Sequence, residues 1–233
     1  MESLKQKYQK ISQEFLKNIK KGNKVVCALI TGSYFNNKLS ENSDIDIFII
    51  TSDSDIAKRG VKRISNVKIS FFMNSLMMVK RLLNEEKDLF KRPTAERIVF
   101  SDCIYGEELS KKLKEEASNV IKRKLPKLTK KEIYDYGWYL YDKVIVLKRD
   151  LDKIQKQFMI NDLFWICTDI FFKINRTYKP HNKYVLPKIK ELDSIFYEYL
   201  KEHLTGSEEA IFKMTDYLQK EMGFHQKDYS ITY

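Results

Sequence analysis

Glycine, proline and cysteine are all scarce in this sequence, whose 233 residues include 7 Gly, 4 Pro and 3 Cys. So few glycines and prolines exclude a low-complexity chain and favour long regular helices and strands. Cys27, Cys103 and Cys167 are odd in number, far apart and set in apolar surroundings, without the spacing of metal ligands. We interpret them as buried free thiols of a reducing compartment, which predicts a cytoplasmic protein.

Long apolar runs are also missing. No stretch of 18 consecutive apolar residues occurs, so we expect no membrane span and no membrane partner. The N-terminus is lysine-rich and amphipathic, and it lacks the apolar core and small-residue cleavage site of a secretory signal.

Charge is not scarce, and it is unevenly distributed. The net charge is +11, and residues 1–124 hold 25 Lys and Arg against 16 Asp and Glu, whereas residues 125–233 hold 18 against 16. A basic N-terminal half favours a polyanionic ligand such as a nucleotide or RNA. A lysine-rich surface that is merely solvated explains the same excess, and the composition does not decide between the two.

The most informative stretch joins two apolar segments through a glycine turn. Residues 24–31 and 44–51 are rich in β-branched residues and predict two buried strands, with Gly32 and Ser33 at the end of the first. Asp44 and Asp46 begin the second, and alternate residues of a strand share one face, about 7 Å apart. Two carboxylates there need a cation between them, and Mg²⁺ takes such ligands together with substrate phosphates. The pattern therefore predicts a site for a metal–triphosphate complex.

The spacing carries a family resemblance. Gly32-Ser33, ten residues and then Asp44-x-Asp46 resembles the signature of the DNA polymerase β-like nucleotidyltransferase superfamily. It is most similar to the small bacterial members, which include antibiotic nucleotidyltransferases and the minimal nucleotidyltransferases of toxin–antitoxin pairs. The resemblance implies that Asp44 and Asp46 are catalytic and bind Mg²⁺ (or Mn²⁺). It also implies that Gly32 and Ser33 bind the β- and γ-phosphates of a nucleoside triphosphate.

One feature of that family is missing. Its members usually carry a third carboxylate on the neighbouring strand, where this sequence has Lys68, or Ser70 in another register, and no Asp or Glu lies between Asp55 and Glu85. Three explanations stay open: a base from elsewhere, a reaction with a single metal site, or nucleotide binding without turnover. The candidate bases elsewhere in the chain are Glu96, Asp102 and Asp135.

Hydrophobic periodicity predicts the remaining elements. We expect further helices over residues 2–20, 76–89 and 107–123, and one further strand over residues 66–73. Residues 52–65 are polar and basic, and Gly60 excludes a long helix there. Residues 101–106 are interpreted as a connection, and residues 93–100 as either a helix or a short strand. After a capping box at Thr129-x-x-Glu132, one apolar stripe runs from Ile133 to Phe158. Later helices are expected over residues 161–178, 185–204 and 207–222.

These elements predict an α+β protein. A small mixed-sheet nucleotidyltransferase domain, residues 1–124, precedes an all-α helical bundle, residues 125–233, with a basic linker around Pro126. In the families that the chain resembles, nucleotide and acceptor bind between two such parts. Lys183, in a polar loop before a helix, is therefore a candidate contact to the triphosphate, where a cation neutralises the departing pyrophosphate.

The expected reaction is metal-dependent transfer of a nucleoside monophosphate from an NTP to an acceptor hydroxyl. The nearly neutral C-terminal half does not favour a polycationic acceptor, so a less charged small molecule, such as a lincosamide antibiotic, fits better. Two alternatives remain: a toxin–antitoxin-type enzyme that modifies a protein or tRNA, and a nucleotide-binding module that has lost catalysis.

Overall fold

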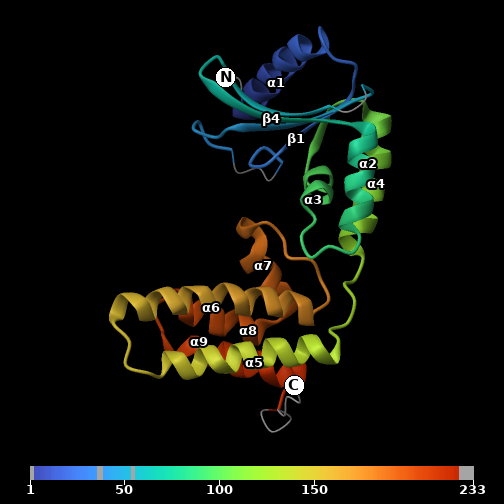
Figure 1. Ribbon diagram of the computed structural model, residues 1–233. Coiled ribbons are helices and arrows are strands. Elements are labelled where there is room, and N and C mark those ends of the chain that lie inside the picture. Colours follow the sequence, from blue (N-terminus) through green and yellow to red (C-terminus); the bar gives the residue numbers. More distant parts are fainter. Residues whose placement is uncertain (1–2, 36–38, 54–55, 226–233) are drawn as a thin grey trace. The chain divides into compact units, whose positions relative to one another are not determined.

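The computed structural model describes residues 3–35, 39–53 and 56–225. The chain divides into two compact units, Met1–Arg123 and Lys124–Tyr233, of which the first contains the sheet and the second is helical (Figure 1). The predicted α+β class is confirmed.

The first unit is built on a mixed sheet with strand order β3-β4-β2-β1-β5 in the described part of the chain. Its central strand, β2, runs antiparallel to β1 and parallel to β4, and β3 and β5 form the two edges. The bounds are β1 Val25–Thr31, β2 Ile45–Thr51, β3 Ala57–Ile64, β4 Val67–Ser75 and β5 Asp102–Tyr105.

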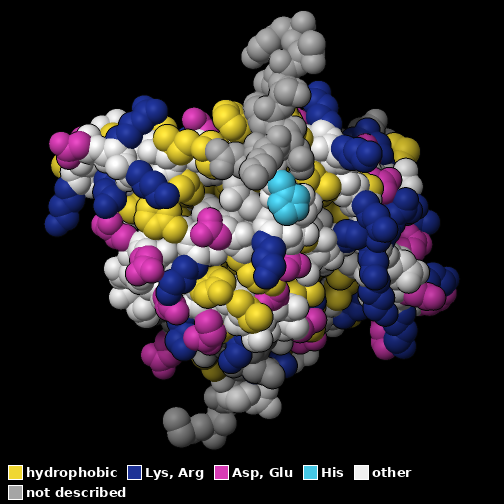
Figure 2. Space-filling view, turned by 90° about the horizontal axis from the view of Figure 1, so that it is seen from below, with side chains coloured by type: hydrophobic (Ala, Val, Ile, Leu, Met, Phe, Trp, Pro, Cys, Tyr) yellow, Lys and Arg dark blue, Asp and Glu magenta, His cyan; other side chains and the backbone are white. Residues whose placement is uncertain are grey.

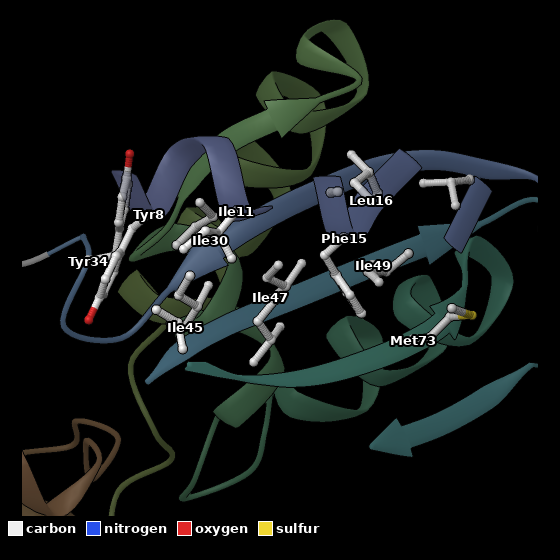
Figure 3. Close-up of a cluster of buried hydrophobic side chains, with 14 residues drawn as sticks. Tyr8, Ile11, Phe15, Leu16, Ile30, Tyr34, Ile45, Ile47, Ile49 and Met73 are labelled. Atoms are coloured by element: carbon white, nitrogen blue, oxygen red, sulfur yellow. The ribbon is translucent and has the colours of Figure 1, made fainter. Parts of the chain in front are cut away.

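One face of the sheet is covered by α1 (Leu4–Lys20). Tyr8, Ile11 and Phe15 of this helix recur every three or four residues and point onto the sheet (Figure 3). Beneath them lie the side chains of alternate β2 residues, all fully buried: Ile45, Ile47 and Ile49. The strand period of two thus assigns these isoleucines to the α1 face.

The opposite face is covered by three helices, α2 (Leu76–Glu86), α3 (Pro93–Val99) and α4 (Glu107–Lys122). The second core contains Phe48 and Ile50 of β2, packed with apolar side chains that the helices contribute: Val79, Leu83, Ala95, Ile98, Leu113 and Ala117. Since β2 is buried on both faces, its sequence is a nearly continuous apolar run.

Two buried charged residues hold α3 in place. Glu86, at the end of α2, accepts hydrogen bonds of 2.8 Å from the backbone N–H groups of Thr94 and Ala95 in the first turn of α3. Arg92 is fully buried and donates to backbone carbonyls on both sides of it, among them Lys87 O at 3.1 Å and Arg123 O at 2.8 Å. The position of α3 therefore depends on this pair.

The second unit consists of helices in the described residues. Their bounds are α5 Lys130–Leu147, α6 Lys153–Ile174, α7 Asn182–Leu192, α8 Ser194–Leu204 and α9 Glu209–Met222. The capping box predicted at Thr129 is present, and the core includes Phe171 stacked on Phe196 at 4.4 Å between ring centroids. On the surface shown in Figure 2, acidic and basic side chains alternate with small apolar areas.

None of the helices in the described part of the chain is both long and apolar enough to span a bilayer. Cys27 and Cys167 are buried, Cys103 is half-buried, and all three are free thiols.

Two segments for which the sequence predicts no strand contain one. Residues 52–65 contain β3, which is an exposed edge strand and therefore lacks an apolar face that would mark it. A tight turn joins β3 to β4 through Ser65 and Asn66, both with positive φ, of 48° and 63°. Residues 101–106 contain the short strand β5, and the undecided segment 93–100 forms α3.

Two predicted helical runs are each interrupted. The stripe from Ile133 to Phe158 breaks between Leu147 and Lys153, because the Asp152 side chain accepts hydrogen bonds from the N–H groups of Ile154 and Gln155 and starts a new helix. The helix expected over residues 185–204 is divided in the same way at Asp193, which caps α8.

We predict that Arg92→Leu lowers the free energy of unfolding by about 3 kcal/mol, because buried carbonyls around α3 lose their donor. The measurement is urea unfolding followed by circular dichroism. Arg81→Leu, on the exposed side of α2, is the matched control and should change stability by less than about 0.5 kcal/mol. Equal effects of the two substitutions would contradict this role of Arg92.

Candidate functional site

Asp44 and Asp46 lie at the end of the sheet face that α2, α3 and α4 cover, where this face becomes accessible. In the sheet, Asp46 pairs with Thr31 of β1 and Ser70 of β4. It shares a face with Phe48, two residues later, and therefore points to the side opposite α1. Both aspartates are half-buried, and this face becomes polar as β2 leaves the core. The strand period thus places the two predicted site carboxylates on one face.

The Gly32 turn packs directly against Asp46. Gly32 has φ of +72°, and a Cβ atom built on it would lie 2.6 Å from Asp46 Oδ2. A side chain at this position would therefore be strained and would also fill the space beside the carboxylate. Ser33 follows and is half-buried, while Tyr34 is buried in the α1-side core and anchors the exit from the turn. Glycine at position 32 keeps the backbone close to Asp46.

The loop before Asp44 is attached to α1. The Tyr8 hydroxyl lies 3.0 Å from the carbonyl of Ser43 and 3.1 Å from that of Ser40. Burial raises the pKa of Tyr8, and the negative charges of Asp44 and Glu41 raise it further. Tyr8 therefore stays protonated at neutral pH and holds the segment that positions Asp44.

Lys68, one of the two candidates for the position of the missing carboxylate, contacts Asp44. Its Nζ lies 2.5 Å from Asp44 Oδ2, and each of the two side chains is 41% exposed. Ser70, the other candidate for this slot, lies opposite Asp46 on β4. An ion pair this exposed contributes at most about 1 kcal/mol. Lys68 is therefore a weakly held cation that a ligand can displace from Asp44.

The residues fit one magnesium or manganese ion that arrives with a nucleotide. The described part of the chain contains no group of three His, Cys, Asp or Glu side chains that could hold a metal ion. Mg²⁺ needs only one or two carboxylates when phosphates and water complete its octahedral shell. Asp44 and Asp46 supply that number, and both side chains are partly accessible.

The other predicted site residues lie in different surroundings. Asp102 of β5 pairs with Ile30, which faces α1, and forms a 3.8 Å ion pair with Lys5 of that helix. It therefore lies on the face opposite Asp46, which removes it as a third carboxylate. Glu96 is half-buried on α3, and Asp135 lies on α5 in the second unit. Lys183, at the start of α7 in the second unit, is exposed, and its role as a triphosphate contact stays a prediction.

Sequence reasoning missed an arginine near Asp46. Arg97 of α3 lies over the rings of Phe72 and Phe48, with its guanidinium carbon 4.2 Å and 5.4 Å from their centroids. Phe48 is two residues beyond Asp46 on the same face. The sequence did not predict this position of Arg97, because it left residues 93–100 as either a helix or a strand, and only the helix brings Arg97 over the sheet.

We predict that Gly32→Ala lowers stability by about 1–2 kcal/mol, because alanine at positive φ is strained and its Cβ pushes on the Asp46 carboxylate. Thermal unfolding measures the loss. Gly22→Ala, where an added Cβ meets nothing within 4 Å, is the control and should have little effect. Unchanged stability in Gly32→Ala would show that the turn does not press on Asp46.

Comparisons with known proteins give one family match and one similar solved structure. The family model described as polymerase beta, nucleotidyltransferase, matches residues 10–108. Among solved structures, the chain is similar to a nucleotidyltransferase-like protein from Exiguobacterium sibiricum 255-15, with 11% sequence identity, a TM-score of 0.47, and coverage of 93% of this chain and 74% of that one. Curated protein sequences give no match. The family match spans the Gly32 turn, Asp44 and Asp46, so residues 10–108 resemble the nucleotidyltransferase domain of the DNA polymerase β-like superfamily.

Proposed function

We propose that this chain transfers a nucleoside monophosphate from an NTP to an acceptor hydroxyl. The observation that carries the proposal is the arrangement of Asp44 and Asp46 on one sheet face, with the Gly32 turn packed against Asp46. Two carboxylates beside a glycine turn are suited to a divalent cation and the phosphates that it carries.

Each residue has a distinct role in this proposal. The Gly32 turn admits the phosphate chain close to the backbone, and the Ser33 hydroxyl donates to a phosphate oxygen. Asp44 and Asp46 would hold one Mg²⁺ or Mn²⁺. When bound, such an ion stabilises negative charge on the attacking and leaving oxygens of a phosphoryl transfer. Displaced from Asp44, the Lys68 ammonium is free to neutralise a phosphate oxygen.

The reaction is an in-line substitution at the α-phosphorus. The acceptor hydroxyl oxygen forms the new bond to the α-phosphorus, and its proton passes to water. The bond between the α-phosphorus and the oxygen that bridges the α- and β-phosphates breaks, and pyrophosphate leaves with that electron pair. Positioning and charge neutralisation supply most of the catalysis in such transfers. We propose a small, weakly charged molecule as the acceptor, because the second unit has nearly balanced charge. The basic first unit suits the alternative acceptors, a tRNA or a protein.

A second function is favoured by the Lys68–Asp44 ion pair. The Lys68 ammonium, 2.5 Å from Asp44 Oδ2, takes the place that a metal ion would have at that oxygen. If Lys68 remained there, the chain would bind a nucleotide without transferring it. This alternative and the enzymatic one differ in turnover and not in the residues that contact the nucleotide.

We predict that Asp44→Asn and Asp46→Asn each reduce nucleotidyl transfer by at least about a hundredfold, since each removes one of two charges that hold the cation. The assay is pyrophosphate release from each NTP with Mg²⁺ and a panel of small-molecule, tRNA and protein acceptors. Glu115→Gln, on the exposed side of α4, is the control and should leave activity unchanged. Full activity of both aspartate variants would contradict the proposed site, whereas tight NTP binding without pyrophosphate release by the wild-type chain would favour the second function.

We predict that Lys68→Asp tightens Mn²⁺ binding at least about threefold, because a third carboxylate replaces an ammonium that competes for Asp44. Electron paramagnetic resonance of free Mn²⁺ gives the affinity. The control is Lys62→Asp, whose side chain is exposed on β3 and, opposite Ile69, belongs to the other face of the sheet. Equal gains in the two variants would mean that general electrostatics, and not the position of Lys68, governs the metal.

A further inference from the structure

Arg97 is a half-buried cation without a polar partner among the described residues. Its guanidinium lies 4.2 Å from the centroid of Phe72 and 5.4 Å from that of Phe48, and within the described ranges it makes neither a hydrogen bond nor an ion pair. A guanidinium carries five N–H donors in a planar fork that matches the oxygens of a phosphate or carboxylate. Stacking on aromatic rings satisfies none of these donors.

A second guanidinium lies beside the same ring. Arg59 of β3 is exposed, pairs with Phe72 in the sheet, and has its guanidinium carbon 5.4 Å from the Phe72 centroid. Burial lowers the pKa of Arg97, and the like charge of Arg59 lowers it further, whereas Asp46, Glu86 and Glu96 act in the opposite direction. Two like charges around one ring repel each other, and an anion between them would relieve that repulsion.

Both arginines are close to the candidate nucleotide site along the sheet. Phe72 follows Ser70 by two residues on β4, and Phe48 follows Asp46 by two residues on β2. All four side chains therefore share the face that α2, α3 and α4 cover. Arg97, over Phe48 and Phe72, therefore lies one side-chain row from Asp46, on the side of the sheet where a nucleotide would bind. Arg59 belongs to the same row as Phe48 and Phe72, but it lies on β3, two strands away from β2.

The charge balance of the site also favours an anion contact here. One divalent cation held by Asp44 and Asp46 is neutralised by these two carboxylates, which leaves the negative charge of a triphosphate largely uncompensated. Lys68 offsets part of it. A bidentate guanidinium that is already oriented over Phe72 offsets more, and it loses little side-chain freedom on binding.

We propose that Arg97, assisted by Arg59, binds phosphate oxygens of the nucleoside triphosphate. This inference rests on the proposed function, since it places the triphosphate on the face that carries Asp44 and Asp46. It gives Arg97 a role in substrate binding and makes the Phe72 ring the platform that orients the guanidinium.

The test uses Arg97→Met, which keeps an unbranched apolar side chain over Phe72 and Phe48 but removes the charge. Calorimetry measures the affinities of ATP, ADP, AMP and adenosine, each with Mg²⁺, for the wild-type chain and the variant. We expect ATP binding to weaken roughly ten- to a hundredfold, with the loss shrinking as phosphates are removed and absent for adenosine. Thermal unfolding should show that the variant is at least as stable as the wild-type chain, because an unpaired, half-buried charge is gone. Arg81→Met, on the exposed side of α2, is the matched control and should change neither quantity.

Other outcomes separate this inference from the proposed function. One outcome is that the wild-type chain binds ATP, that Asp46→Asn weakens this binding, and that Arg97→Met leaves it unchanged. The proposed role of Arg97 would then be wrong, and the nucleotide site would still be supported. A destabilised Arg97→Met chain with unchanged ATP affinity would assign Arg97 a purely structural role. If the wild-type chain binds none of the NTPs, both the proposed function and this inference are overturned. Rescue of ATP affinity by Arg97→Lys relative to Arg97→Met would support a charge contact.

Discussion

The burial of β2 on both faces is the constraint on which the site depends. Ile45, Ile47 and Ile49 must face α1, so the residues between them must face the three helices on the other side. Phe48 and Ile50 fill that second core. Asp46 belongs to the same row of side chains and extends it toward solvent, since a carboxylate cannot be buried there without a partner. A shift of one residue in register would put both carboxylates into the α1 core, so packing alone fixes where they point.

The neighbours of Asp46 turn this position into a charged site. Lys68 reaches Asp44 from β4, Arg97 reaches over Phe48 from α3, and Arg59 adds a charge from the edge strand. The placement of Arg97 depends in turn on two buried residues. Glu86 accepts hydrogen bonds from the backbone of α3, and Arg92, just before α3, donates to the carbonyls of Lys87 and Arg123. Two carboxylates surrounded by three cations suit a ligand that itself combines a metal ion with several negative charges, as a metal–NTP complex does.

The sequence was sufficient for the parts of this arrangement that follow from local pattern. The alternation in β1 and β2, the Gly32 turn and the capping box at Thr129 are local signals, and the structure contains the strands and helix that they predict. Strand β3 carried no such signal, because an exposed edge strand has no apolar side. The breaks at Asp152 and Asp193 were missed because apolar periodicity continued across them, although each aspartate caps a new helix. Arg97 was beyond prediction because its contacts with Phe48 and Phe72 join distant segments.

We propose that one divalent cation and one nucleotide bind together at Asp44 and Asp46. It is tested most directly by counting Mn²⁺ ions bound per chain by electron paramagnetic resonance, with and without a non-hydrolysable NTP analogue. We expect one tightly bound ion per chain in the presence of the analogue, and its loss when Asp44 and Asp46 are both changed to Asn. An ion that binds equally well to the double variant, or analogue binding that is unaffected by removal of all divalent metal, would contradict it.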